Sequence, residues 1–280
     1  MNELAARSSL DRLRDRVATV GAPLCIGIDP HPDRLPDGFS PDANGIERFA
    51  RGLLEVVSEH AAAVKLNVAF YEALGAAGWR VLERIRAEVP PDLFCILDGK
   101  RGDIGSTAER YAAGLLGHLS GDAVTVSPYL GEDAIEPFLA YPGRMVYLLV
   151  RTSNPSAAQL QGLPVGGRPL FERVAMWAAE RWPDGRVGLV VGATAPAELE
   201  RIRSIAPVPG FLVPGVGQQG GDLAAAVRYC RGRGAPGLVS ISRGISEAST
   251  GPDWREAARA AAKDALKRMR EADATLARSR

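Results

Sequence analysis

Eight short apolar runs, each followed by an amphipathic stretch, recur along the chain and most strongly limit its possible folds. The runs are apolar throughout rather than alternating, as expected for parallel strands covered on both faces. Eight such repeats in about 250 residues predict a (β/α)8 TIM barrel, with a doubly wound open sheet as the alternative. The predicted strands are Pro23–Asp29, Ala63–Val68, Phe94–Asp98, Ala123–Ser127, Met145–Val150, Gly188–Val191, Phe211–Val213 and Gly237–Ser242.

The stretches between these runs show the spacing of apolar residues that is typical of surface helices. Glu132–Ala140, between strands four and five, is short but can hold two turns of helix. Ser106–Glu109 fits a capping box that would begin the helix after strand three. The predicted helices are Gly45–His60, Tyr71–Ala87, Thr107–Leu119, Pro169–Arg181, Pro196–Ile205, Leu223–Arg233 and a last helix, Trp254–Arg270.

The chain is long and apolar enough to form one barrel, with 280 residues of which 46% are hydrophobic. No sharp change of composition marks a boundary, so we expect a single domain over residues 1–280. The loops 30–44 and 152–168 are longer than a barrel needs. Both would lie at its C-terminal face, so we expect them to be active-site loops.

Charge, hydropathy and cysteine content indicate the kind of partner and the cellular compartment to expect. A formal net charge of +1 gives no indication of nucleic-acid or membrane binding. No apolar run is long enough to span a bilayer, and the charged segment Met1–Val20 lacks the apolar core of a signal peptide. Three widely spaced cysteines favour a cytoplasmic protein with thiols in its core. The three histidines show no metal-ligand spacing.

A group of charged residues directly follows the apolar part of the third predicted strand. Asp98, Lys100 and Asp103 follow four apolar residues and alternate with glycines that let the backbone turn. Because side chains alternate along a strand, Asp98 and Lys100 face the same side if the strand continues through them. Strand-to-helix turns of this kind carry the active sites of parallel α/β proteins. A surface turn with a local ion pair is the alternative.

Lys65 lies inside an otherwise apolar strand, where an unpaired ammonium is costly. Since a closed barrel has no sheet edge from which it could reach solvent, Lys65 is expected to face acidic groups at the barrel mouth. Asp29, at the end of strand one, would join Lys65, Asp98 and Lys100 in a chain of alternating charges, with Asp103 as a candidate fifth member. Such a chain is costly to desolvate, which favours a functional role.

Two segments after strands seven and eight predict a phosphate site. Val213–Asp222 contains the spacing G-x-G-x-x-G, but the dinucleotide fingerprint belongs to a first βαβ unit and needs an acid that Ala235–Ser242 lacks. Its glycines suit a phosphate cradle instead. Arg243 follows strand eight with a guanidinium suited to bidentate phosphate contact. Barrels commonly hold phosphate in these two loops.

The residues therefore indicate a barrel that binds a small phosphorylated ligand against an Asp/Lys array. Neighbouring acids keep Lys100 protonated, whereas a lysine nucleophile needs an apolar pocket. We therefore predict that Lys100 acts as a proton donor or a charge partner. Proton delivery to a carbanion is one chemistry that fits.

The segment Asp98–Thr107, read as D-G-K-R-G-D-I-G-S-T, resembles the signature of the orotidine 5′-phosphate decarboxylase family. Four further segments fall in the family's order: Ile28–Pro30, Val64-Lys65, Pro214–Gly221 and Ser242–Ile245. The resemblance spans almost the whole chain and looks like the longer bacterial subgroup. It implies conversion of orotidine 5′-monophosphate to UMP and CO₂ in pyrimidine biosynthesis, by a homodimeric barrel that uses no metal or organic cofactor.

The resemblance also implies roles for individual residues. Lys100 would protonate C6 as CO₂ leaves, and Asp98 would lie beside the departing carboxylate. Asp29 and Lys65 would hold the ribose hydroxyls and complete the charge network. Three residues would be contributed to the neighbouring subunit's site and make the dimer obligatory for activity: Asp103, Ile104 and Thr107.

Substrate contacts at the two ends of the nucleotide are implied in the same way. Ser153 would contact the pyrimidine, with Thr152 and Asn154 as alternatives. Gln219 and Arg243 would hold the phosphate, and Gln219 is preferred to its neighbour because it directly precedes two glycines. Ser242 departs from the family pattern, since many relatives have glycine beside the arginine.

Two rival functions stay open. Hexulose-phosphate synthases and keto-gulonate-phosphate decarboxylases share D-x-K-x-x-D, but they use Mg²⁺ and need an acidic ligand near the end of strand two, where this chain has Lys65. A non-catalytic sensor of phosphorylated ligands is the other rival. It would have no need to bury Asp98 beside Lys65 and Lys100.

Overall fold

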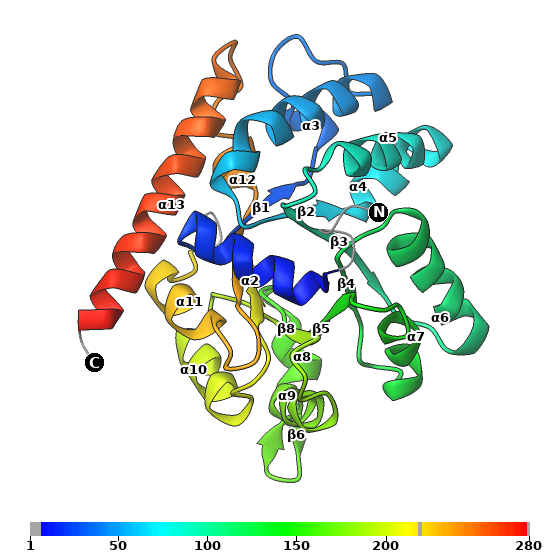
Figure 1. Cartoon of the computed structure of the whole chain (residues 1–280), viewed down its shortest axis with the longest axis vertical. Helices are drawn as coiled ribbons and strands as arrows, with labels where there is room; N and C mark the ends of the chain where they lie inside the picture. Colours follow the sequence, from blue (N-terminus) through cyan, green and yellow to red (C-terminus); the bar gives the residue numbers. More distant parts are fainter. Residues whose placement is uncertain (1–6, 218–219, 279–280) are drawn as a thin grey trace.

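A closed barrel of eight parallel strands forms the centre of the molecule, and helices surround it (Figure 1). The computed structural model describes residues 7–217 and 220–278. Around the barrel the strand order is β1-β10-β9-β8-β5-β4-β3-β2, which confirms the predicted (β/α)8 fold and excludes the open sheet. The barrel strands are β1 (Leu24–Ile28), β2 (Ala63–Asn67), β3 (Phe94–Arg101), β4 (Ala123–Val126), β5 (Met145–Arg151), β8 (Val187–Val191), β9 (Phe211–Val213) and β10 (Leu238–Ile241).

Most of the outer helices agree with the predicted ones except at their ends. The last helix continues beyond its predicted end, and the helix after β9 stops three residues early, at Cys230. The principal helices are α3 (Ala43–Val57), α4 (Val68–Glu72), α5 (Gly75–Glu88), α6 (Gly105–Ala112), α7 (Glu136–Leu139), α9 (Leu170–Arg181), α10 (Pro196–Ile205), α11 (Leu223–Cys230), α12 (Arg243–Ser246) and α13 (Trp254–Arg278). Short helical turns are η1 (Pro32–Arg34), η2 (Ser58–His60), η3 (Ala113–His118) and η4 (Glu132–Ala134).

Two helix predictions are wrong in their details. The predicted helix Tyr71–Ala87 is divided into α4 and α5, because Gly75 adopts a left-handed φ of 60° between them. The predicted capping box is also wrong, since α6 begins at Gly105 and no side chain caps it. Gly105 enters the helix through a φ of 53°, which places Ser106 inside the first turn rather than before it.

Helix α2 (Ser9–Val20) was not predicted and lies across one end of the barrel in Figure 1. Its Leu10 and Leu13 join the buried cluster formed by residues at the starts of the strands, so it closes the N-terminal end. Asp122, which is fully buried, fixes this helix to the barrel. Its carboxylate accepts hydrogen bonds from Ser9 and Arg12 of α2 and from the backbone of β3.

The three cysteines lie in the core, as predicted, and none forms a disulfide. Burial raises the pKa of the Cys25 thiol to about 12 and that of Cys95 to about 11. The thiols therefore stay protonated at neutral pH and act as small apolar side chains.

The loop 152–168 contains regular structure. Helix α8 (Ala157–Gln161) follows its first residues, and an antiparallel hairpin, β6 (Pro164–Val165) and β7 (Arg168–Pro169), ends it. The hairpin projects from the barrel at the lower edge of Figure 1. Arg173 of α9 donates hydrogen bonds to the carbonyls of Val165 and Gly166, which holds the hairpin against α9.

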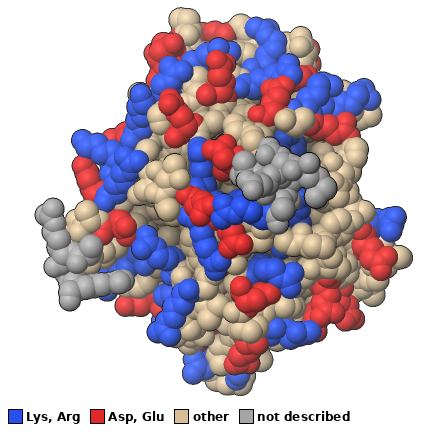
Figure 2. Space-filling model, in the orientation of Figure 1, with Lys and Arg blue, Asp and Glu red and all other residues tan. Residues whose placement is uncertain are grey.

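Positive and negative side chains are interspersed over the visible face of the molecule (Figure 2). This distribution agrees with the formal net charge of +1. Across residues 7–217 and 220–278, none of the helices combines the length and the hydropathy that crossing a membrane would require.

Candidate active site

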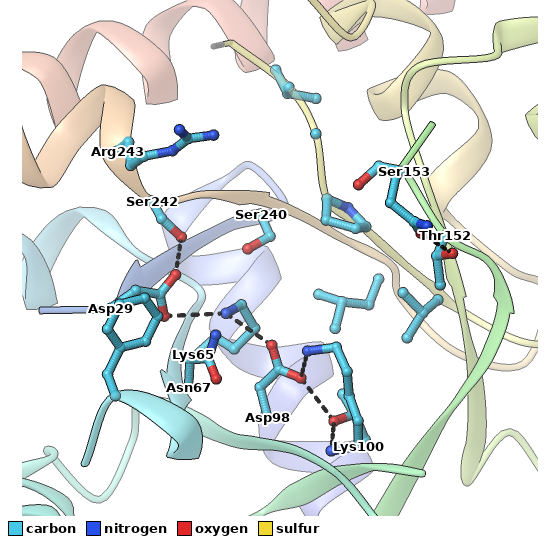
Figure 3. A pocket seen from close by; sticks show the side chains of 18 of the residues that line it. Asp29, Lys65, Asn67, Asp98, Lys100, Thr152, Ser153, Ser240, Ser242 and Arg243 are labelled. Carbon is cyan, nitrogen blue, oxygen red and sulfur yellow. Dashed lines mark hydrogen bonds and ion pairs between the residues drawn. The ribbon is translucent and has the colours of Figure 1, made fainter. Parts of the chain in front are cut away.

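A cavity of about 570 Å³ opens at the C-terminal ends of the barrel strands. It brings together six of the predicted site residues, and Figure 3 shows them converging from different strands. Three others, Asp103, Ile104 and Thr107, lie on the turn after β3 and in the first part of α6 and are not among its described lining residues, and Gln219 lies outside the described residues. The six that line the cavity are Asp29, Lys65, Asp98, Lys100, Ser153 and Arg243.

Four of these residues form a continuous chain of ion pairs. Lys65 Nζ lies 3.4 Å from Asp29 Oδ1 and 3.1 Å from Asp98 Oδ2, and Lys100 Nζ lies 2.7 Å from Asp98 Oδ1. Parallel pairing of β1, β2 and β3 sets these distances, because it places Asp98 beside Asn67, two residues beyond Lys65. The chain of alternating charges is therefore present. Asp103 does not join it; its carboxylate accepts the N–H of Ile104.

Burial differs along the chain of ion pairs. Lys65 is only 7% exposed and Asp98 only 8%, whereas the side chain of Lys100 is 50% exposed toward the cavity. Burying two charges costs desolvation free energy, and the attraction between the two charges seldom exceeds this cost. Asp98 therefore holds the ammonium of Lys100 in place, while the exposed part of the Lys100 side chain stays accessible to a ligand in the cavity.

A backbone irregularity in β3 sets the orientation of Lys100. The register between β3 and β4 shifts between Leu97 and Arg101, and Lys100 has a φ of 45°, in the left-handed region that non-glycine residues rarely adopt. The hydroxyl of Thr125, on β4, accepts the Lys100 N–H at 2.9 Å and donates to Asp98 Oδ1 at 2.8 Å. This strained backbone at the cavity indicates a functional constraint.

Lys65 and Asp98 are both charged at neutral pH. Burial opposes ionisation of both Lys65 and Asp98, but opposite charges outweigh it. Asp29 and Asp98 raise the pKa of Lys65 above its ordinary value. Lys65 and Lys100, together with the hydroxyl of Thr125, hold the pKa of Asp98 well below its usual range.

We expect Asp98 to make stability depend on pH in the acid range. Because its pKa is lowered by folding, it contributes stability above its unfolded pKa, about 3.9, and that contribution is lost as the pH falls through the folded value. Asp98→Asn should be less stable than the wild type by about 3 kcal/mol near neutral pH. Urea unfolding should show this difference shrinking below about pH 4, and a difference that stays constant would contradict the shift.

Two contacts of the ion-pair chain were not predicted, one at its Asp29 end and one at its Lys100 end. Ser242 donates a hydrogen bond to Asp29 Oδ2 at 2.7 Å. Gly27 makes room for it, because a Cβ there would lie 1.9 Å from Ser242 Oγ and 3.1 Å from Asp29 Oδ2. Thr125 was also missed, although a hydroxyl inside the apolar run Ala123–Val126 was a visible signal.

Arg243 lies at the wall of the cavity formed by β10 and the glycine-rich segment after β9. It is half-buried, and within the described part of the chain its guanidinium makes no hydrogen bond or ion pair. Gly215 has a φ of 96° and lines the same wall. A partly buried cation without an anionic partner is suited to bind an anionic ligand.

The described residues contain no group of three or more His, Cys, Asp or Glu side chains arranged to hold a metal ion. Of the acidic groups that line the cavity, Asp29 and Asp98 are paired with lysines and Glu247 is paired with Arg34.

Comparisons with known proteins agree on one family. Residues 22–261 match the model of the orotidine 5′-phosphate decarboxylase / HUMPS family. The orotidine 5′-phosphate decarboxylase of Roseiflexus castenholzii is 49% identical over 245 residues, which cover 86% of this chain and 89% of that one. Leishmania donovani OMP decarboxylase is 38% identical with a TM-score of 0.81, covering 94% of this chain and 98% of that one.

Leishmania donovani UMP synthase gives a TM-score of 0.83 at 40% identity. The match covers 94% of this chain but only 57% of the length of that protein. The chain is therefore an enzyme that belongs to the orotidine 5′-phosphate decarboxylase / HUMPS family.

Proposed function

We propose that this protein converts orotidine 5′-monophosphate to UMP and CO₂. The main support for the proposal is the chain of ion pairs that ends in an accessible Lys100, within one cavity that is also lined by Arg243, whose guanidinium has no partner among the described residues. An ammonium donor and a phosphate-binding cation at two ends of a cavity suit a phosphorylated substrate that must be protonated. The 49% identity to a protein named for this activity supports the same assignment.

The proposed reaction is a carbanion mechanism. The bond between C6 and the carboxylate carbon breaks, its electron pair stays on C6, and CO₂ leaves. A proton then moves from Lys100 Nζ to C6, and Lys100 recovers a proton from water. Asp98, which is 2.7 Å from Lys100 Nζ, would lie beside the departing carboxylate and keep the ammonium oriented. Asp29 and Lys65 would bind the ribose hydroxyls.

Electrostatic magnitudes favour stabilisation of the carbanion over repulsion of the substrate. Two unit charges about 4 Å apart interact by roughly 4 kcal/mol at an effective dielectric constant of about 20. Lys65 and Lys100 reduce the repulsion between Asp98 and a substrate carboxylate below this value. Enzymes lower barriers by about 8–23 kcal/mol. The preorganised ammonium of Lys100 is therefore the larger contribution, and distant phosphate contacts supply binding energy that orders the site.

We also propose that the active enzyme is a homodimer whose subunits share residues. Asp103, Ile104 and Thr107 follow β3 but do not line the cavity of their own barrel as described. Ile104 is 55% exposed, and Tyr129, on the adjacent turn after β4, is 76% exposed. Exposed large apolar side chains beside a cavity are typical of a protein interface, so a second copy of the chain suits this rim.

Hybrid dimers should recover activity that both parent variants lack. In a dimer of one Asp103→Ala subunit and one Lys100→Ala subunit, one of the two sites would keep both residues intact. Verified heterodimers should therefore show about half of the wild-type turnover per dimer, since one site of two is complete. Turnover of purified heterodimers carrying two different tags measures this. Absence of any recovery would argue against a shared site.

A spectrophotometric assay of the purified protein with orotidine 5′-monophosphate in the presence of a chelator tests the proposed function. We expect full turnover that the chelator does not reduce. Activity that disappears with the chelator and returns with Mg²⁺ would favour the sugar-phosphate enzymes of the same superfamily. Tight binding of the nucleotide without turnover would favour a sensor.

A further inference from the structure

Gln161, the last residue of α8, holds the first residue of the loop after β5 with both ends of its side-chain amide. Its Oε1 accepts the N–H of Thr152 at 2.9 Å, and its Nε2 donates to Thr152 Oγ1 at 2.8 Å. Arg151 Nη1 donates to the carbonyl of Thr152 at 2.8 Å. The N–H, the carbonyl and the hydroxyl of Thr152 are thus all bound, two of them by the same side chain.

The hydrogen bonds continue from Thr152 to the next polar side chains. The Thr152 hydroxyl donates to Asn154 Oδ1 at 2.6 Å, and Asn154 Nδ2 donates to Ser156 Oγ at 3.1 Å. The side chains of Thr152 and Asn154 are therefore already engaged with the protein. Among the residues that the structure describes, none forms a hydrogen bond with the hydroxyl of Ser153, which lines the cavity (Figure 3).

Gly192 fixes the same segment from the other side. A Cβ on Gly192 would lie 3.0 Å from Ser153 Cβ and 3.1 Å from both its Cα and its backbone nitrogen. The backbone of Ser153 therefore packs directly against Gly192, just after the end of β8, where a larger side chain would crowd it. Gly192 N–H also donates to the carbonyl of Arg151 at 2.7 Å. Ser153 is held between Gly192 on one side and the residues bound by Gln161 on the other.

We propose that Gln161 is a positioning residue, which fixes Thr152 and Asn154 so that Ser153 alone presents a free hydroxyl to the pyrimidine of the substrate. The inference rests on the proposed function, because it assigns the substrate that Ser153 contacts. The two alternatives, Thr152 and Asn154, already use their side chains in hydrogen bonds within the protein. Ser153 is therefore the residue of the three that can contact the pyrimidine. Gln161 itself is not among the residues that line the cavity and acts through Ser153.

A double-mutant cycle separates this role from simple stabilisation of the loop. Gln161→Ala should lower kcat/KM by about 10- to 100-fold, as expected for a misplaced contact group. Gln159→Ala is the matched control, because Gln159 lies on the same helix and is exposed. It should stay within about twofold of the wild type. If Gln161 acts through Ser153, adding Gln161→Ala to Ser153→Ala should cause little further loss.

Nucleotide binding provides a readout that does not depend on turnover. Gln161→Ala should weaken binding of UMP by about tenfold or more and leave binding of ribose 5-phosphate unchanged, because only UMP carries the pyrimidine. Equal weakening of both ligands would indicate general damage to the loop and overturn the proposal. Losses that multiply in the double variant, or wild-type values for Gln161→Ala, would overturn it as well.

A conservative variant covers the case in which Gln161→Ala does not fold. Thr152→Val keeps the shape of the side chain and the N–H bound by Gln161, and removes only the hydroxyl that links Gln161 to Asn154. It should show the same selective loss of UMP binding, and an unchanged affinity would overturn the proposal. A wild-type protein that binds UMP but does not turn over orotidine 5′-monophosphate would refute the proposed function, and the binding experiments would then decide the role of Gln161 separately.

Discussion

Lys100→Ala is expected to abolish decarboxylation, lowering kcat by at least about 10⁴-fold, while UMP still binds. The ammonium lies 2.7 Å from Asp98 and is the exposed end of the ion-pair chain, so alanine removes the proposed proton donor. The proposed phosphate contact of Arg243 lies at another wall of the cavity and would be retained. Loss of kcat with retained product binding is the pattern of an interaction made only in the transition state.

Turnover and UMP affinity of the same preparation measure this effect. Lys263→Ala is the control, because Lys263 is an exposed lysine on α13 and is not among the residues that line the cavity. It should behave as the wild type. Near-normal turnover of Lys100→Ala would refute the role of Lys100. Unfolding followed by circular dichroism should show that the variant remains folded, since Asp98 keeps Lys65 as a partner.

The second large effect is expected at the phosphate end. Arg243→Ala should lower kcat/KM for orotidine 5′-monophosphate by about 10²-fold or more, because it removes a half-buried cation that has no partner in the described protein. Both binding and turnover should suffer, since phosphate binding energy helps to order the site. The measurement is kcat/KM for the nucleotide and for orotidine, the same substrate without its phosphate.

Orotidine acts as the internal control for Arg243. The wild type and Arg243→Ala should process it equally slowly, because the interaction partner of the guanidinium is missing from the substrate. Arg268→Ala, an exposed arginine on α13, should match the wild type with both substrates. A variant that responds equally to the presence and absence of the phosphate would rule out the proposed phosphate site.

The sequence predicted the barrel well because its strands are short apolar runs in a regular order. It also predicted the ion-pair chain, since an ammonium such as Lys65 in an apolar strand must face a partner. Helix α2 was missed because its apolar face is narrow and its partners at the closed end of the barrel come from distant parts of the chain. Its anchor Asp122 lies more than a hundred residues away from Ser9.

The finer features of the site depend on tertiary contacts that a linear pattern does not contain. Thr125 hydrogen-bonds Lys100 only because β3 and β4 shift register beside it. The amide of Gln161 reaches Thr152 only because α8 turns the loop back on itself. The capping box failed for a local reason, since Gly105 allows a left-handed conformation that starts the helix one residue before Ser106.

The proposed reaction breaks the bond from C6 to the carboxylate and protonates C6. Its most direct test is to incubate the wild-type protein in D₂O with orotidine 5′-monophosphate labelled with carbon-13 in the carboxylate, and to follow the products by NMR. We expect labelled CO₂ and UMP in equal amounts, with deuterium at C6 of the UMP. Release of no labelled CO₂, or UMP that carries only protium at C6, would contradict it.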